Sequence, residues 1–175
     1  MTKSNALFVL SLFGLSLVAA GAAAAPKKES ARQVLDRFFA AVDSRKPERL
    51  EEVDAADIEM TTPMGAFRGV EGHKQLTQGF GTAFPNLKHT VTRCIELADT
   101  ISCEGKFSGD HTGPLAMPGG PAVSPTHKHV EFGWSGFATV KNGKVTSMHA
   151  YFDTMAMMQQ LGLVPPAGGA TAARP

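Results

Sequence analysis

The stretch of residues 130–152, VEFGWSGFATVKNGKVTSMHAYF, decides the fold. Apolar and polar side chains alternate on both sides of Asn142-Gly143, a dipeptide that is typical of a two-residue hairpin turn. We therefore expect two antiparallel strands, Val130–Val140 and Lys144–Phe152. Because successive side chains of a strand point to opposite faces of the sheet, every second residue of this hairpin should face the interior.

A second hairpin precedes this stretch and brings the two cysteines together. The strands His89–Leu97 and Thr100–Ser108 flank a two-residue turn at Ala98-Asp99. Counting residue pairs outward from this turn sets Cys94 opposite Cys103, in a pair whose Cα atoms approach to about 4.5 Å. In an oxidising compartment this pairing favours a disulfide over the alternative of two buried free thiols.

Helical patterns dominate the part of the chain before these hairpins. Ser30 and Gln33 form a capping box ahead of an amphipathic helix. The elements expected outside the hairpins are helices Ala31–Asp43, Pro47–Val53 and Val70–Ala83, a strand near Ile58–Thr62, and a short last helix capped by Asp153. Helices followed by an antiparallel sheet indicate an α+β fold.

Both ends of the chain fall outside the expected domain, residues 30–163. Residues 1–24 combine an early lysine, an apolar run and small residues, which is typical of a secretory signal peptide. Residues 25–29 then form a linker, and residues 164–175 are expected to be a disordered tail. We predict a secreted or periplasmic protein that has no contact with the membrane after cleavage; an uncleaved membrane anchor is the alternative.

The charge balance argues against a nucleic-acid partner. The chain has 17 Lys and Arg residues against 16 Asp and Glu residues, and no cluster of basic residues stands out. A protein that binds a phosphate backbone needs such a basic patch.

Short motifs in a fixed order resemble the SnoaL-like polyketide cyclases. They are FRGVEG at 67–72, AFPNL at 83–87, HTGP at 111–114, PT at 125–126 with VEF at 130–132, NGKV at 142–145, and YFD at 151–153 with QQLG at 159–162. The resemblance implies the nuclear-transport-factor-2-like fold, in which a cone-shaped, curved antiparallel sheet wraps around three helices and encloses a pocket.

The resemblance also implies an activity and the positions that serve it. The cyclases of this family close a ring by intramolecular aldol chemistry without a metal or cofactor, using a carboxylate on the last strand as general acid and base. That position corresponds to Ala150, which has no proton to exchange. The supporting polar positions correspond to Trp134, Gly136 and Met60, whose side chains are apolar or absent.

These replacements predict that the pocket binds a small apolar or aromatic molecule. The expected ligand-binding residues, all facing the pocket by strand alternation or by the resemblance, are Met60, Trp134, Gly136, Met148, Ala150 and Phe152. The small residues Gly136 and Ala150 suggest open space beside them. The alternative is that these side chains merely fill the core.

A catalytic hypothesis relies on Asp110 and His111, in the Gly- and Pro-rich loop Gly109–Pro125. A carboxylate beside a histidine is a common acid/base arrangement, and a loop of this length is expected to be a lid or to line the site. The chain would then be a cofactor-independent cyclase, isomerase or hydrolase; the alternative is that both residues shape the loop. Asp153 is assigned to helix capping rather than to chemistry.

Two further hypotheses concern metals and partners. His127 and His129 form an H-x-H pair that His111 could complete as a metal site, but surface pairs of this kind are common, so we predict no metal. The open face of a curved sheet makes a homodimer a further expectation.

Overall fold

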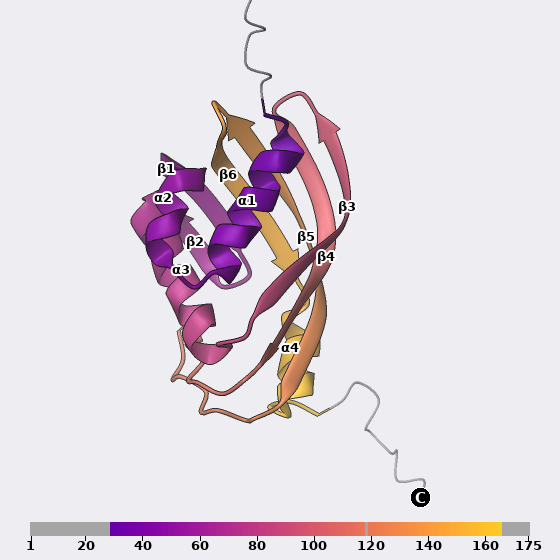
Figure 1. Cartoon of the computed structure of the whole chain (residues 1–175). Helices are drawn as coiled ribbons and strands as arrows, with labels where there is room; N and C mark the ends of the chain where they lie inside the picture. Colours follow the sequence, from indigo (N-terminus) through magenta and orange to yellow (C-terminus); the bar gives the residue numbers. More distant parts are fainter. Residues whose placement is uncertain (1–28, 118, 166–175) are drawn as a thin grey trace, which may run out of the picture.

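The computed structural model describes residues 29–117 and 119–165 (Figure 1). The elements in chain order are α1 (Ala31–Asp43), the 3-10 turn η1 (Pro47–Arg49), α2 (Leu50–Val53), β1 (Asp54–Thr62), β2 (Gly65–Arg68), α3 (Gly69–Ala83), β3 (Lys88–Leu97), β4 (Thr100–Asp110), β5 (His129–Lys141), β6 (Lys144–Phe152) and α4 (Thr154–Leu161). The predicted signal peptide and nearly all of the predicted linker and tail lie outside the described residues. No helix of the described part is long and apolar enough to cross a membrane.

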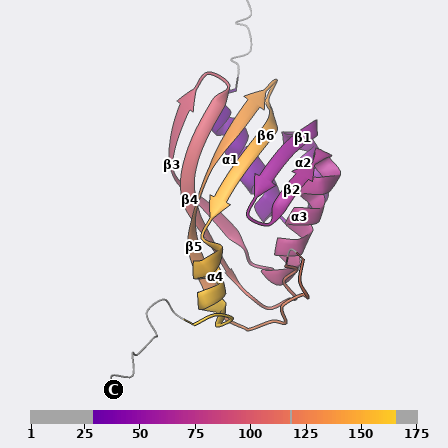
Figure 2. The same cartoon turned by 180° about the vertical axis from the view of Figure 1, so that it is seen from behind.

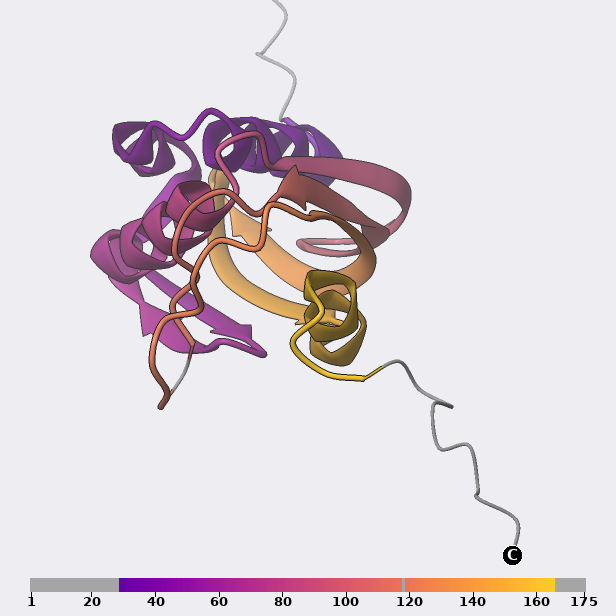
Figure 3. The same cartoon turned by 90° about the horizontal axis from the view of Figure 1, so that it is seen from below.

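One curved sheet forms the body of the domain. Its strands follow the order β2-β1-β6-β5-β4-β3. Helices α1 and α3 lie along its inner face, and the outer face of β3 to β6 is free of them (Figures 2 and 3). The structure therefore confirms the α+β class and the curved sheet wrapped around helices.

Local sequence explains where the elements begin and turn. The Ser30 hydroxyl accepts the N–H of Gln33, and the Gln33 side chain accepts the N–H of Ser30, which completes the predicted capping box of α1. Asn142 and Gly143 take φ values of 52° and 74°, the left-handed region that a tight hairpin turn requires. Asp153 caps α4 by accepting the N–H of Ala156.

The register of the β3–β4 hairpin is the predicted one at the cysteines. Cys94 pairs with Cys103 and the two form a disulfide, with Cα atoms 4.1 Å apart. Beyond them an irregularity between Val91 and Arg93 shifts the register by one residue, so Val91 pairs with Gly105. The structure confirms the disulfide.

Two features of the sheet differ from the prediction. The turn region around Gly65 contains a short strand, β2, which pairs with β1. Strand β1 also runs parallel to β6, whereas the predicted sheet was antiparallel throughout. A strand joined to its neighbour by a hairpin must run antiparallel to it, but β1 and β6 are separated by most of the domain, so no local turn fixes their relative direction.

The long connection between β4 and β5 is a packed part of the domain. The N–H groups of Thr112 and Gly113 donate to the Ala83 carbonyl at the end of α3, over 3.0 and 3.2 Å. Leu115 is buried among core residues. We expected a lid or a site-lining loop, but none of its described residues lines the cavity reported below. The expectation was wrong because backbone hydrogen bonds and Leu115 hold this loop against the end of α3.

Two clusters of apolar side chains form the core. The first lies between helices α1 and α2 and the sheet, and it includes Phe38, Met60 and Met148. The second lies toward α4 and includes Phe107 and Phe132. Trp134 packs against both clusters, so its indole marks their boundary.

Candidate functional site

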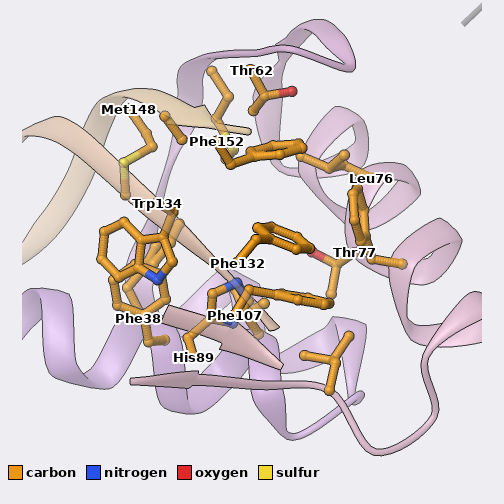
Figure 4. A pocket seen from close by; sticks show the side chains of 16 residues that line it. Phe38, Thr62, Leu76, Thr77, His89, Phe107, Phe132, Trp134, Met148 and Phe152 are labelled. Carbon is orange, nitrogen blue, oxygen red and sulfur yellow. The ribbon is translucent and has the colours of Figure 1, made fainter. Parts of the chain in front are cut away.

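A cavity of about 110 Å³ lies where the two clusters meet, between the inner face of the sheet and helices α1 and α3 (Figure 4). Its lining is almost entirely apolar, and the polar side chains in it are two threonines, one histidine and the indole of the tryptophan. The lining residues are Phe38, Phe39, Val42, Met60, Thr62, Leu76, Thr77, Phe80, Leu87, His89, Phe107, Phe132, Trp134, Met148, Ala150 and Phe152.

Five of the six side chains that were expected to bind a ligand line this cavity: Met60, Trp134, Met148, Ala150 and Phe152. They come together because β1, β6 and β5 are neighbours, with Met60 beside Met148 and Trp134 beside Phe152. Strand alternation therefore placed Trp134, Met148, Ala150 and Phe152 on the correct face, and the resemblance placed Met60 there.

Gly136 is the exception, since it does not line the cavity. A Cβ atom at this position would lie 2.7 Å from the carbonyl oxygen of His149 on the neighbouring strand. Two backbones approach closely here, and only a glycine fits between them. The missing side chain therefore leaves no open space for a ligand. The expectation of open space beside Gly136 is therefore wrong.

The indole of Trp134 is held between a helix and a strand. Its ring centroid lies 4.8 Å from that of Phe39 on α1. On the sheet side the indole covers Gly105, where a Cβ atom would lie 2.7 Å from the ring. The indole Nε1 is buried and has no hydrogen-bond partner in the described part of the chain. A buried donor of this kind is costly unless another group accepts its hydrogen bond.

One histidine in the cavity, His89, was not predicted from the sequence. Its Nδ1 lies 2.6 Å from Oδ1 of Asp43, and its backbone N–H donates to Oδ2 of the same carboxylate over 2.9 Å. Two signals could have revealed the pair. Strand alternation puts His89 on the same face as Phe107, with which it pairs, and Asp43 ends a helix, where a negative charge is unfavourable.

Asp110 and His111 do not form an acid/base pair. Asp110 accepts hydrogen bonds from His129 and Asn86 outside the cavity, and these bonds, that of His129 first, hold the pKa of Asp110 below its usual value. His111 is fully buried against Phe84 in the second cluster. The two side chains differ in surroundings because neighbouring residues of an extended chain point in opposite directions. Neither lines the cavity, and the structure does not bring the two side chains together.

The H-x-H pair is also separated. His127 has a φ of 57°, so the strand alternation that would align it with His129 does not extend to it. Nδ1 of His129 lies 2.7 Å from Oδ1 of Asp110. Within residues 29–117 and 119–165 there is no group of three or more side chains arranged to hold a metal ion.

Burial of His111 predicts a specific pH dependence of stability. The N–H of Thr126 donates to Nδ1 of His111 over 3.1 Å, so the neutral ring carries its proton on Nε2. Burial, and then the charge of His127, lower the pKa of His111. A histidine whose pKa is lower in the folded chain stabilises the fold above the unfolded pKa of about 6.5, and this contribution is lost as the pH falls below that value.

Replacing His111 by glutamine should remove this part of the acid sensitivity. The Gln side-chain carbonyl can still accept the Thr126 N–H, but it does not titrate. Thermal unfolding from neutral to mildly acidic pH should show the melting temperature of the wild type falling more than that of His111→Gln. Parallel curves for the two proteins would show that His111 does not control acid stability. Asp110 is unchanged in both, so it cancels in the comparison.

Comparisons with known proteins agree with this fold. The family model for SnoaL-like polyketide cyclases matches residues 32–161. A proposed SnoaL-like polyketide cyclase from Jannaschia sp. CCS1 superposes with a TM-score of 0.68 at 18% identity, covering 81% of this chain and 97% of that one. IdmH, a proposed polyketide cyclase from Streptomyces antibioticus, gives 0.65 at 21% identity, covering 77% and 99%.

A third structure extends the likeness. A protein of ketosteroid isomerase-like fold from Catenulispora acidiphila, solved with trimethylamine, gives a TM-score of 0.62 at 17% identity, covering 74% of this chain and 92% of that one. No curated protein sequence matches the chain. At these identities the structures establish the fold alone, while the family model spans most of the chain. The chain belongs to the SnoaL-like polyketide cyclase family.

Proposed function

We propose that the cavity binds a small apolar or aromatic molecule. The observation that carries this proposal is the lining, in which six phenylalanines, one tryptophan and two methionines surround an unfilled space of about 110 Å³. Ligand sites combine such apolar walls with a few placed polar groups, and the threonines, His89 and the Trp134 N–H fit that role.

The size of the cavity limits the ligand. An engineered apolar cavity of about 150 Å³ in another protein binds benzene. The present cavity is somewhat smaller, so we expect a molecule with a single ring, accommodated by small movements of the flexible Met60 and Met148 side chains.

Binding is favoured over the ring closure performed by the family. The resemblance places the acid/base carboxylate at Ala150, and here a methyl group faces the cavity instead. The alternative acid/base pair, Asp110 and His111, lies outside the cavity. No cofactor or metal is part of the proposal.

The fluorescence of Trp134 tests this proposal, because it is the only tryptophan in the chain. Iodobenzene, an apolar ring whose iodine quenches indole emission, should quench it with a saturable dependence on concentration. Filling the cavity with Ala150→Leu should weaken this binding by about tenfold or more, a typical effect of added groups in an apolar pocket.

Ser135→Leu is the matched control. Ser135 is the exposed neighbour of Trp134 on β5, outside the cavity, so the same side chain added there should leave binding unchanged. Quenching that never saturates, or that responds equally to both variants, would contradict binding in this cavity.

We also propose that the protein is exported, to the periplasm or beyond the cell. The apolar N-terminal segment and the Cys94–Cys103 disulfide support this, since such bonds persist in oxidising compartments. Pairing of two copies through the outer face of the sheet stays a prediction.

A further inference from the structure

The position of His89 gives the cavity a group that can accept a proton. Its ring lies among cavity-lining aromatic rings, with centroid distances of 5.1 Å to Phe39, 5.4 Å to Phe107 and 6.3 Å to Trp134. Asp43, whose carboxylate lies at hydrogen-bonding distance from Nδ1 of His89, is not among the lining residues. The imidazole ring of His89 therefore contacts Asp43 outside the cavity on one side and lines the cavity on the other.

Asp43 fixes which nitrogen of His89 carries the proton. A carboxylate can only accept hydrogen bonds, so Nδ1 must donate to Asp43 Oδ1 over their 2.6 Å separation. In the neutral ring Nε2 is then the unprotonated nitrogen. Among the residues that the structure describes, no side chain or backbone group hydrogen-bonds to it. Its lone pair is available to a ligand.

The placement of Asp43 favours a role beyond stability. It is the last residue of α1, where the helix dipole disfavours a negative charge, and the last turn of the helix has no basic side chain to compensate. Its two oxygens nevertheless both serve His89, one on the ring and one on the backbone N–H. Such a carboxylate–histidine pair is the usual way to orient an imidazole as a general base.

A hydrogen-bond donor lies close to this base. The Nε1–H of Trp134 is buried without a partner in the described part of the chain. In Figure 4 the indole nitrogen is turned toward His89, and the two ring centroids are 6.3 Å apart. Both rings belong to residues that line the cavity, so one bound molecule can contact both. An unpartnered donor suits a position where negative charge develops on oxygen.

We propose that His89, positioned by Asp43, is a general base that removes a proton from the carbon next to the carbonyl group of a bound single-ring ketone. Nε2 takes the proton, the C–H electron pair forms the carbon–carbon double bond of an enolate, and the carbonyl electron pair moves to the oxygen, which accepts the Trp134 N–H. The imidazolium then returns the proton to the same carbon, or to a conjugated carbon further along. No other reactant is consumed. This inference rests on the proposed binding function.

Deuterium exchange into phenylacetone tests the proposal. Its methylene group lies between an aromatic ring and a carbonyl, and in D₂O an imidazolium that exchanges with solvent should return deuterium to that carbon. Proton NMR should show the methylene signal decaying faster with the wild-type protein than in the buffer blank. His89→Gln and Asp43→Asn should each reduce the catalysed rate by about 100-fold or more, a typical contribution of a general base.

The matched controls carry the same chemical changes outside the cavity. Asp36→Asn alters another α1 carboxylate, which pairs with Arg32 at the surface, and His149→Gln alters an exposed histidine on β6. Both should exchange phenylacetone at the wild-type rate.

A tautomer measurement separates positioning by Asp43 from a merely structural role. In Asp43→Asn the amide oxygen can keep the His89 backbone N–H, while the amide NH₂ donates to Nδ1 and moves the ring proton to Nε2. Nitrogen-15 NMR of the His89 ring should show the protonated nitrogen changing from Nδ1 to Nε2 in this variant. An unchanged tautomer with full exchange activity would overturn the role given to Asp43.

The outcomes distinguish this inference from the binding proposal. Phenylacetone should compete with iodobenzene in the Trp134 quenching assay. If it competes but exchanges no faster than in the blank, or if His89→Gln exchanges it normally, the general-base proposal is wrong and the binding proposal stands. If iodobenzene binds and phenylacetone does not, the ketone class is wrong. If neither binds, the proposed function itself fails.

Discussion

Replacing His73 by leucine should lower the free energy of unfolding by about 3–5 kcal/mol, the usual cost of leaving a buried charge without its partner. Nδ1 of His73 lies 2.7 Å from Oδ2 of Asp54, and the two side chains are only 3% and 0% exposed. The other carboxylate oxygen of Asp54 already lacks a hydrogen-bond partner in the described part of the chain. Removing the imidazole would leave a buried carboxylate with no side-chain partner.

Urea denaturation of three variants tests this expectation. In the double variant His73→Leu with Asp54→Leu the orphaned carboxylate is gone, so part of the lost stability should return. As a control, Arg68→Leu breaks the exposed pair of Arg68 with Glu59 and should cost no more than about 1 kcal/mol. A loss of similar size for His73→Leu and Arg68→Leu would show that the buried pair contributes little.

This pair matters to the cavity because it anchors one of its walls. His73 lies one turn before Thr77 on α3, and Thr77 lines the cavity together with Leu76. Asp54 begins β1, the strand that carries the lining residue Met60. The His73–Asp54 contact therefore sets the spacing between α3 and β1 at one end of the cavity.

The fold was predictable where local turns control it. Two-residue turns fixed both hairpin registers near the turn, and a side-chain period of two then placed Trp134, Met148, Ala150 and Phe152 on one face. The pairing of β1 with β6 and the short strand β2 were not predicted, because they depend on contacts between distant parts of the chain.

The functional side chains were harder to find than the cavity wall. Asp43 and His89 are 46 residues apart and come together only because the end of α1 packs on the beginning of β3. Asp110 and His111, by contrast, are adjacent in sequence, and the extended backbone turns them apart. Proximity along the chain was the wrong guide in both cases.

Ala150→Asp should lower the free energy of unfolding by about 2–5 kcal/mol at neutral pH, because the new carboxylate would face apolar walls. The loss of stability has an upper limit, because a carboxyl group in such surroundings can take up a proton and become neutral. Burial raises the pKa of a carboxyl group by at most about 3–5 units, and each unit corresponds to about 1.4 kcal/mol. A carboxyl whose pKa is higher in the folded chain destabilises the fold above the unfolded pKa of about 3.9, and the loss disappears as the pH falls toward that value.

Thermal or urea unfolding of Ala150→Asp and Ala150→Asn over this pH range separates charge from shape. The two side chains have nearly the same size, but the amide does not titrate, so only the Asp variant should regain stability in acid relative to the wild type. Equal, pH-independent losses would show a purely steric effect. Full stability of Ala150→Asp at neutral pH would show that the cavity solvates a carboxylate, and such a cavity would be a poor match for an apolar ligand. A loss of stability that disappears in acid is therefore the result that agrees with apolar binding. It would also explain why a methyl group suits the position that the family resemblance assigns to a carboxylate.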